Sequence, residues 1–261
     1  MTKFHFFKYQ GTGNDFVLID NRDFFFDGNN VDLIASLCHR RFGVGADGLM
    51  LLEPSEKSSF TMRYYNSDGR EATMCGNGGR CIAAFAVNRG VVKEQTYFSF
   101  DAADGLHEAF VDGEKVSLKM VDVSGLEEME GGLYLDTGSP HFVKFVDDPA
   151  QVNVGKEGKY WRNHELFSPG GTNVNFVGKP LNGEVPMRTF ERGVEEETWS
   201  CGTGAVASAI ATYIRDGEST SVGMNVPGGK LTVSFDVKET GGFENIWLNG
   251  PAKYVFEGIM G

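Results

Sequence analysis

The chain has 261 residues, 41% of them hydrophobic and 23% charged, and its 36 acidic and 24 basic residues give a formal net charge of −12. This length allows one large domain or two of ordinary size, with a core that needs no metal or disulfide, and the negative charge argues against nucleic acid or an anionic membrane surface as a partner. No run approaches the roughly 20 apolar residues of a membrane helix, and the first residues lack the apolar segment of a secretory signal, so we expect a cytoplasmic protein with reduced thiols.

The first 120 residues predict a strand-rich region with two helices. A helix is expected at about 30–41, with Asn30 as its N-cap. A second helix follows from MCGNGGRCIAAFAVNRG at 74–90, because its run after Arg80 is apolar and its last glycine, Gly90, is a typical helix stop. Alternating apolar residues predict strands at 3–9, 16–20, 60–65, 96–100 and 115–120.

The rest of the chain offers a similar series of elements. A weak helix pattern covers about 151–162, and a strong one covers SCGTGAVASAIATYIRDG at 200–217. Alternation predicts strands at 132–136, 142–146, 174–177, 185–190, 230–235 and 245–248. The order strand, strand, helix, strand, strand does not suit a doubly wound parallel sheet. It favours an α+β fold in which mostly antiparallel strands wrap around a central helix.

An internal repeat connects the two series. Cys75 and Cys201, each at the start of a strong helix pattern, are 126 positions apart. The match of GTGNDFVLID to DTGSPHFVKFVDD has the same offset when Phe16 is set on Phe142. Several blocks at one offset indicate two homologous halves, with a C-terminal segment that alternates like a strand and returns to the first half. The predicted boundaries are 1–119 with 250–261 for the first half and 120–249 for the second.

The two repeated cysteines lie where a helix N-terminus is expected. The unpaired N–H groups at such an end carry partial positive charge, which favours a thiolate and also binds a carboxylate. Two such ends facing each other across a cleft between the halves would place one thiol on each side of a carbon. One thiolate would remove a proton and the opposite thiol would return one, which inverts a stereocentre without a cofactor.

Plainer interpretations of the cysteines also exist. A lone cysteine near a helix start is most often a small buried hydrophobe, and we interpret Cys38 and Cys81 in that way. A pair of ionisable thiols also suits a redox switch. The cysteine spacing fits no zinc pattern, so no metal is expected. The stretch CGNGGR lacks the Gly-Lys-Ser/Thr ending of a phosphate-binding loop.

Five motifs in order resemble the diaminopimelate epimerase family. They are GTGNDFVLID, YNSDGREATMCGNGGRC, GSPHFV, GTNVNF and ERGVEEETWSCGTGA, and together they span almost the whole chain. The resemblance implies two similar halves with an active-site cleft between them. It also implies interconversion of LL- and meso-diaminopimelate by two cysteines, in lysine and peptidoglycan precursor synthesis, with neither pyridoxal phosphate nor another cofactor. A homodimer is a further expectation from the family.

The resemblance assigns roles to individual residues. Cys75 and Cys201 would be the acid/base pair, and His141 and Glu191 would help to hold them poised. Glu191 would also meet an ammonium group of the substrate, and the fork of Arg192 would bind the distal carboxylate. Backbone amides would bind the reacting end at Gly76, Asn77, Gly202 and Thr203. Polar side chains would line the site at Asn14, Asn66, Asn173 and Ser139.

Two positions depart from the family pattern, and two rival functions stay open. Ser139 stands where many members have asparagine, and Gly48 stands where some have a glutamine that touches substrate. One rival is a proline racemase or hydroxyproline epimerase, relatives that favour a histidine where this chain has Asn77. The other is the thiol redox switch.

Overall fold

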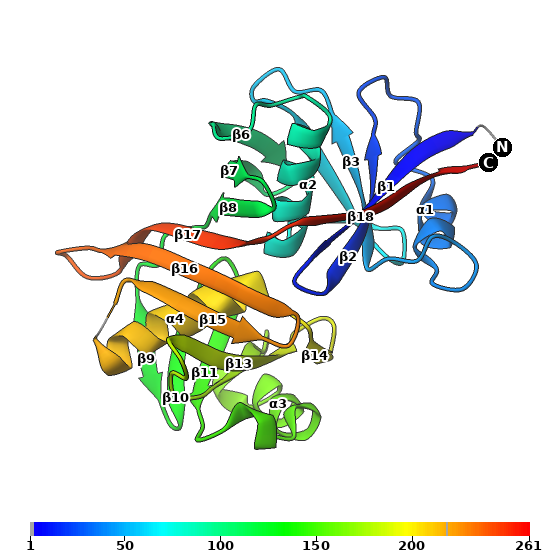
Figure 1. Cartoon of the computed structure of the whole chain (residues 1–261). Coiled ribbons are helices and arrows are strands. Elements are labelled where there is room, and N and C mark those ends of the chain that lie inside the picture. Colours follow the sequence, from blue (N-terminus) through cyan, green and yellow to red (C-terminus); the bar gives the residue numbers. More distant parts are fainter. Residues whose placement is uncertain (1–2, 218) are drawn as a thin grey trace. The chain divides into compact units, whose positions relative to one another are not determined.

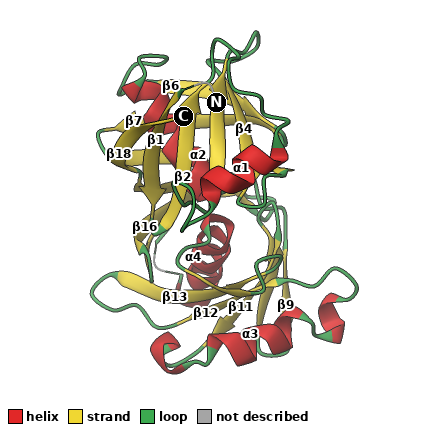
Figure 2. Cartoon of the chain, turned by 90° about the vertical axis from the view of Figure 1, so that its right-hand side faces the viewer, coloured by secondary structure: helices red, strands yellow, loops and turns green. Residues whose placement is uncertain are grey.

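The chain divides into two compact units, which are described here by a computed structural model of residues 3–217 and 219–261. One unit is Met1–Leu118 with Gly250–Gly261, and the other is Lys119–Asn249. In each unit, strands surround one long helix, α2 in the first and α4 in the second (Figures 1 and 2). The predicted α+β class with two similar halves is confirmed.

The first unit is built from two hairpins and a meander connected by parallel pairings. Strand β1 pairs antiparallel with β2 and with the C-terminal strand β18. Then β2 runs parallel to β3, β3 antiparallel to β4, and β4 parallel to β6, which continues into antiparallel β7 and β8. Its elements are β1 Phe4–Gly11, β2 Asn14–Asp20, α1 Val31–Cys38, β3 Gly48–Glu53, β4 Thr61–Asn66, β5 Glu71–Ala72, α2 Gly76–Asn88, β6 Tyr97–Ala102, β7 Gly105–Asp112, β8 Lys115–Lys119 and β18 Lys253–Met260.

The second unit repeats the same order of pairings. Strands β10 and β11 are antiparallel, β11 and β12 parallel, β12 and β13 antiparallel, and β13 and β15 parallel, followed by antiparallel β16 and β17. Its elements are β9 Leu126–Met129, β10 Gly132–Asp136, β11 Pro140–Phe145, η1 Pro149–Gln151, α3 Val154–Arg162, η2 Glu165–Phe167, β12 Asn173–Val177, β13 Glu184–Glu191, β14 Glu196–Thr198, α4 Gly202–Asp216, β15 Ser221–Val226, β16 Gly229–Val237 and β17 Phe243–Pro251.

Local sequence signals explain where the helices begin and end. The side chain of Asn30 accepts a hydrogen bond from Leu33 N–H at 3.1 Å and caps α1. Helix α4 ends at Gly217, whose φ of +68° is the left-handed conformation that suits glycine. Gly158 lies within α3 because a Cβ there would come within 2.3 Å of the Phe190 Cβ.

Strand β3 is one of several strands that the sequence pattern does not predict, along with β5, β7, β9, β14 and β15. All six of its residues are buried, since helices pack on both of its faces. A strand buried on both faces shows no polar alternation, and its apolar run cannot be told from a helix segment by periodicity.

The repeat register through the strands is 125, which corrects the offset of 126 expected from Phe16 and Phe142. Val17 packs with residues of the outer helix α1, so its neighbour Phe16 lies on the opposite face of β2. In the second unit it is Phe142 that packs with residues of the outer helix α3, and Val143 that packs with residues of α4. A one-residue slip exchanges the two faces of a strand. The structural counterpart of Phe16 is therefore His141.

Candidate active site

Cys75 is the N-cap of α2, the helix at the centre of the first unit. It has extended backbone angles, and its Sγ accepts a hydrogen bond from Gly78 N–H at 3.2 Å. The residues that follow it, Gly76 and Asn77, are buried in the first turn of the helix. The half-buried thiol thus lies beside backbone N–H groups at the positive end of the helix dipole, as the sequence predicts.

A fully buried arginine ties this helix start to the β1–β2 turn. Arg80 donates to Asn77 Oδ1 at 2.9 Å and to Thr12 Oγ1 at 3.0 Å, and also to the carbonyls of Gly76 and Pro251 at 3.3 and 3.4 Å. Burial lowers the pKa of Arg80 to about 10, which still leaves it charged at neutral pH. The arginine therefore fixes the side chain of Asn77.

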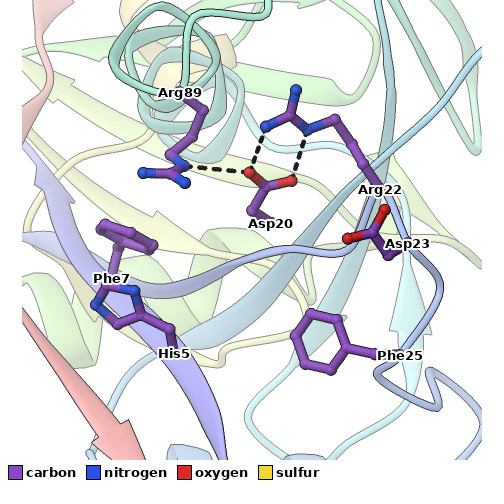
Figure 3. Close-up of a pocket in the computed structure, with 7 residues that line it drawn as sticks. All are labelled: His5, Phe7, Asp20, Arg22, Asp23, Phe25 and Arg89. Carbon is purple, nitrogen blue, oxygen red and sulfur yellow. Dashed lines mark hydrogen bonds and ion pairs between the residues drawn. The ribbon is translucent and has the colours of Figure 1, made fainter.

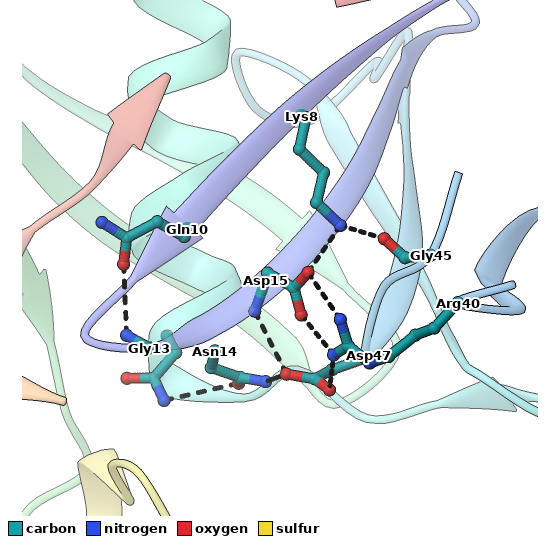
Figure 4. A network of polar contacts seen from close by, with 9 residues as sticks. Lys8, Gln10, Gly13, Asn14, Asp15, Arg40, Gly45 and Asp47 are labelled. Atoms are coloured by element: carbon teal, nitrogen blue, oxygen red, sulfur yellow. Dashed lines mark hydrogen bonds and ion pairs between the residues drawn. The ribbon is translucent and has the colours of Figure 1, made fainter. Parts of the chain in front are cut away.

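Asn14 connects Cys75 to a charged network on the same unit (Figure 4). Its Nδ2 donates to the Asp47 carboxylate at 2.5 Å, which leaves its Oδ1 at 3.4 Å from Asn77 Nδ2 and 4.0 Å from Cys75 Sγ. Because a carboxylate only accepts hydrogen bonds, Asp47 sets the orientation of the Asn14 amide. Arg40 in turn donates to Asp47 at 2.6 Å.

The same Arg40 also contacts Asp15, and so does the buried Lys8. Arg40 and Lys8 lie 2.7 and 2.6 Å from the Asp15 carboxylate, and Lys8 Nζ donates to the carbonyl of Gly45. Burial alone would raise the pKa of Asp15, but its hydrogen bonds with Arg40 and Lys8 lower it to about 2. This network anchors the strand end that carries Asn14.

Cys201 precedes the first turn of α4, the equivalent helix of the second unit. It is buried, and its side chain makes no capping hydrogen bond to the helix backbone. Its Sγ lies 3.4 Å from Thr203 Oγ1 instead. The carbonyl of Thr203 accepts a hydrogen bond from Thr137 Oγ1 at 3.0 Å, so a threonine of the β10–β11 turn holds this helix start.

His141 lies next to Thr203 and is completely buried on β11. Its Nε2 is 2.9 Å from Thr203 Oγ1 and 3.1 Å from Ser139 Oγ, and its Nδ1 is 3.0 Å from Asn175 Nδ2. Burial, together with the positive charge of Arg192, lowers the pKa of His141 to about 3. The imidazole is therefore neutral at physiological pH.

Asn173 connects Ser139 to the turn after β13. Its Nδ2 donates to the carbonyl of Pro140 at 2.9 Å and to Ser139 Oγ at 3.4 Å, and its Oδ1 accepts from Arg192 N–H at 2.9 Å. The Arg192 guanidinium donates to the carbonyl of Gly170 at 3.4 Å. Asn173 thus fixes the position of Ser139, a predicted substrate contact, by a hydrogen bond within the second unit.

Glu191 ends β13 on the same strand face as Thr189. Burial raises the pKa of its carboxyl above the ordinary value. Asn66, its counterpart in the first unit at the 125-residue offset, is exposed at the end of β4, where the turn to β5 begins. Gly48 lies beside it on β3, and a Cβ there would come within 2.6 Å of the Tyr64 ring.

The structure thus brings the predicted residues together in two groups, one in each unit. The first group comprises Asn14, Cys75, Gly76 and Asn77, with Asn66 nearby on β4. The second comprises Ser139, His141, Asn173, Cys201, Gly202 and Thr203, with Glu191 and Arg192 at the end of β13.

Sequence reasoning missed several partners of these groups. Asp47, Arg80 and Asn175 each contact a predicted site residue, and Thr189 contacts Asn175. One signal was available: Asn173 and Asn175 are two residues apart in the apolar stretch NVNFV, so both side chains lie on one face of a buried strand.

A cavity of about 400 Å³ lies at the other end of α2 (Figure 3). Arg89, the C-cap of α2, and Arg22 both contact the Asp20 carboxylate there, at 3.1 and 2.6 Å. Phe7 lies under the Arg89 guanidinium. The cavity contains none of the predicted site residues, and its two arginines already share one carboxylate.

Within residues 3–217 and 219–261, no three or more His, Cys, Asp or Glu side chains are grouped in a way that could hold a metal ion. Nor does any helix in these ranges have the length and apolar character needed to cross a membrane.

Comparison with known proteins decides the family. A sequence model described as diaminopimelate epimerase matches residues 6–124 and 133–255. The chain belongs to the diaminopimelate epimerase family. A diaminopimelate epimerase of Flavobacterium psychrophilum is 49% identical over 96% of this chain and 98% of its own length. One of Chlorobaculum tepidum is 42% identical over 96% and 98%. The predicted class, an amino-acid epimerase acting on diaminopimelate, is confirmed by this membership of the family.

Several solved structures of low sequence identity share the fold of this chain. A PhzF-family phenazine biosynthesis protein of Bacillus anthracis has a TM-score of 0.79 at 16% identity and covers 100% of this chain and 99% of its own. A hydroxyproline epimerase from Agrobacterium vitis, solved with trans-4-hydroxy-L-proline, has a TM-score of 0.67 at 16% identity, covering 99% and 92%. At this identity the likeness shows the shared fold alone.

Proposed function

We propose that this chain interconverts LL- and meso-diaminopimelate with Cys75 and Cys201 as its acid/base pair. The observation that carries the proposal is that both cysteines immediately precede a buried helix in equivalent places of two similar units. Each is followed by a glycine and a polar residue, so that unpaired N–H groups lie next to the thiol. Membership of the family indicates that diaminopimelate is the substrate.

In the proposed reaction, a thiolate removes the α-proton of one amino-acid end of the substrate. The electron pair of the broken C–H bond moves onto the adjacent carboxylate. The opposite thiol then gives its proton to the other face of the carbon, so a thiolate and a thiol exchange places. Backbone N–H groups at Gly76, Asn77, Gly202 and Thr203 are donors for the charge that develops on the carboxylate.

The remaining predicted residues recognise the ends of the substrate in this proposal. The Arg192 guanidinium makes one 3.4 Å contact to the Gly170 carbonyl, so it retains donors for a bidentate bond to the distal carboxylate. Glu191 binds an ammonium group, which would restore the charge that burial disfavours. The amide and hydroxyl side chains of Asn14, Asn66, Asn173 and Ser139 line the site.

We also propose a cytoplasmic homodimer that serves lysine and peptidoglycan precursor synthesis. What supports the dimer is strand β18, which exposes a run of apolar side chains at Tyr254, Val255, Phe256 and Ile259. An apolar run of this kind on a strand marks an interaction surface. Light scattering on the wild type and on a Phe256→Glu variant tests it: a dimer that becomes a monomer is expected, and a wild-type monomer would contradict it.

Turnover of LL-diaminopimelate by the reduced protein tests the reaction. Formation of the meso isomer is expected for the wild type, whereas Cys75→Ala and Cys201→Ala should each abolish it and keep the wild-type circular dichroism spectrum. Turnover of proline in its place would favour the racemase rival. If the fully reduced protein exchanges the α-hydrogen of neither substrate, the redox switch would be the remaining interpretation of the two cysteines.

A further inference from the structure

A chain of buried hydrogen bonds runs through the second unit and ends at the Cys201 sulfur. Thr189 Oγ1 donates to Asn175 Oδ1 at 2.9 Å, and Asn175 Nδ2 donates to His141 Nδ1 at 3.0 Å. His141 Nε2 then contacts Thr203 Oγ1 at 2.9 Å, and that hydroxyl lies 3.4 Å from Cys201 Sγ. The four residues upstream of the sulfur come from β13, β12, β11 and the first turn of α4.

The direction of every hydrogen bond in the chain is set by its first members. Because the Asn175 amide donates to Nδ1, the neutral imidazole of His141 must carry its proton on Nε2. Nε2 is nearer to Thr203 Oγ1, at 2.9 Å, than to Ser139 Oγ, at 3.1 Å, and the Thr203 hydroxyl also accepts from Ser139 Oγ at 3.3 Å. With both lone pairs of its oxygen occupied, Thr203 has only its own hydrogen left, and the remaining partner for it is Cys201.

The first unit lacks an equivalent chain in the same three strand positions. The counterparts of His141, Asn175 and Thr189 at the 125-residue offset are Phe16, Met50 and Tyr64. The rings of Phe16 and Tyr64 pack edge to face, 6.0 Å apart. The polar chain is therefore specific to the side of Cys201, although polar groups buried in a core cost free energy unless they are fully paired.

We infer that Asn175 and Thr189 are positioning residues, which fix the tautomer of His141 so that Thr203 donates a hydrogen bond to Cys201 and favours its thiolate form. A donor directed at the charged form of a group stabilises that form. The inference deepens the proposed function, and it rests on Cys201 being one of the two acid/base groups. Cys75 takes a backbone donor, Gly78 N–H, in place of such a chain.

The charged groups around Cys201 do not duplicate this effect. The elements packed against α4 near Cys201 bring the neutral His141 from β11, the half-buried Glu191 from β13 and Arg192 from the turn that follows. Strand β12 contributes the amides of Asn173 and Asn175. Of these, Arg192 alone is a permanent cation, and neither Thr189→Val nor Asn175→Leu, the variants that test the inference, changes it.

The tautomer of His141 in the wild-type protein is the first test and needs no variant. Nitrogen-15 NMR of histidine-labelled protein is expected to show, for His141, a protonated Nε2 and an unprotonated Nδ1 throughout the neutral pH range. A protonated Nδ1 would overturn the inference, because Asn175 would then be accepting rather than donating.

The pH dependence of alkylation at Cys201 is the second test. Peptide mass spectrometry after brief iodoacetamide treatment follows both cysteines in one sample, so Cys75 serves as an internal control. In Thr189→Val, which removes only the hydroxyl, and in Asn175→Leu, the alkylation midpoint of Cys201 should rise by about one pH unit, a tenfold change in thiolate. Thr189→Ser, which keeps the hydroxyl, should have the wild-type alkylation midpoint at Cys201. The midpoint of Cys75 should stay unchanged in all three variants.

These outcomes are distinguishable from failure of the proposed function. Alkylation is measured without substrate, whereas turnover of LL-diaminopimelate by the wild type tests the proposed function. A Cys201 midpoint that stays in place in both variants, or that shifts together with that of Cys75, would refute the positioning role even in a fully active enzyme.

Discussion

Acid should destabilise the second unit through His141, and the size of the effect follows from its burial. The pKa of His141 is about 3 in the folded chain, against 6.5 for an ordinary histidine. Below pH 6.5, His141 therefore binds a proton in the unfolded chain, whereas in the folded chain it stays unprotonated down to about pH 3. Stability is fully present above 6.5 and falls with pH across this window.

The expected magnitude is about 1.4 kcal/mol for each pH unit below 6.5, or about 2 kcal/mol in the free energy of unfolding between pH 7 and 5. The variant His141→Gln removes the titrating group, so this part of the pH dependence should disappear. The variant is expected to be less stable at pH 7, because its amide cannot satisfy both neighbours of the imidazole with the same geometry.

Urea unfolding followed by tryptophan fluorescence is a suitable assay. All three tryptophans, Trp161, Trp199 and Trp247, belong to the unit Lys119–Asn249, which also contains His141. The measured quantity is the loss of unfolding free energy between pH 7 and 5, compared between wild type and variant. His164→Gln, which changes a partly exposed histidine of the same unit, is the matched control. Equal losses in wild type and His141→Gln would refute the reasoning.

Three more predictions concern single side chains. Gly204→Ala places a Cβ 2.5 Å from Asn175 Oδ1 and should lower the free energy of unfolding in urea by about 1–3 kcal/mol. Gly155→Ala, whose Cβ would have its nearest atom at 3.8 Å, should raise it by up to about 1 kcal/mol. Equal effects of the two substitutions would contradict the packing. Arg80→Met leaves buried acceptors unpaired and should reduce amide hydrogen-exchange protection in α2 by about 3 kcal/mol; unchanged protection would show that the arginine is dispensable. Arg192→Lys keeps the charge without the fork and should raise the KM for diaminopimelate about tenfold with a smaller change in kcat; an unaltered KM would remove Arg192 from substrate binding.

The fold class was predictable because its signals are local. Asn30, Gly90 and Gly217 mark helix ends through their own backbone and side-chain preferences. The repeated Cys-Gly blocks identify both central helices without any knowledge of strand pairing. Strand β3 escaped prediction because its burial is set by helices packed on both of its faces, which leaves no periodic pattern in its own residues.

The parts of the site that escaped prediction depend on long-range pairing. Asn175 reaches His141 because β11 and β12 run parallel, so that residues 34 positions apart become neighbours. Asp47 reaches Asn14 by a similar route between β2 and the residue just before β3. The repeat offset was also misjudged by one residue, since aligning two phenylalanines ignores which face of the strand each occupies.

The central claim is that two different thiols act on opposite faces of one carbon, and isotope partition in heavy water tests it most directly. LL-diaminopimelate is converted to a small extent by reduced enzyme in D₂O, and both isomers are analysed by mass spectrometry. The two-thiol account predicts α-deuterium in the meso product while the remaining LL substrate stays unlabelled. The contrary result is that deuterium enters the recovered substrate as fast as it enters the product, while part of the product retains its hydrogen. That result would mean that a single group acts on both faces of the carbon.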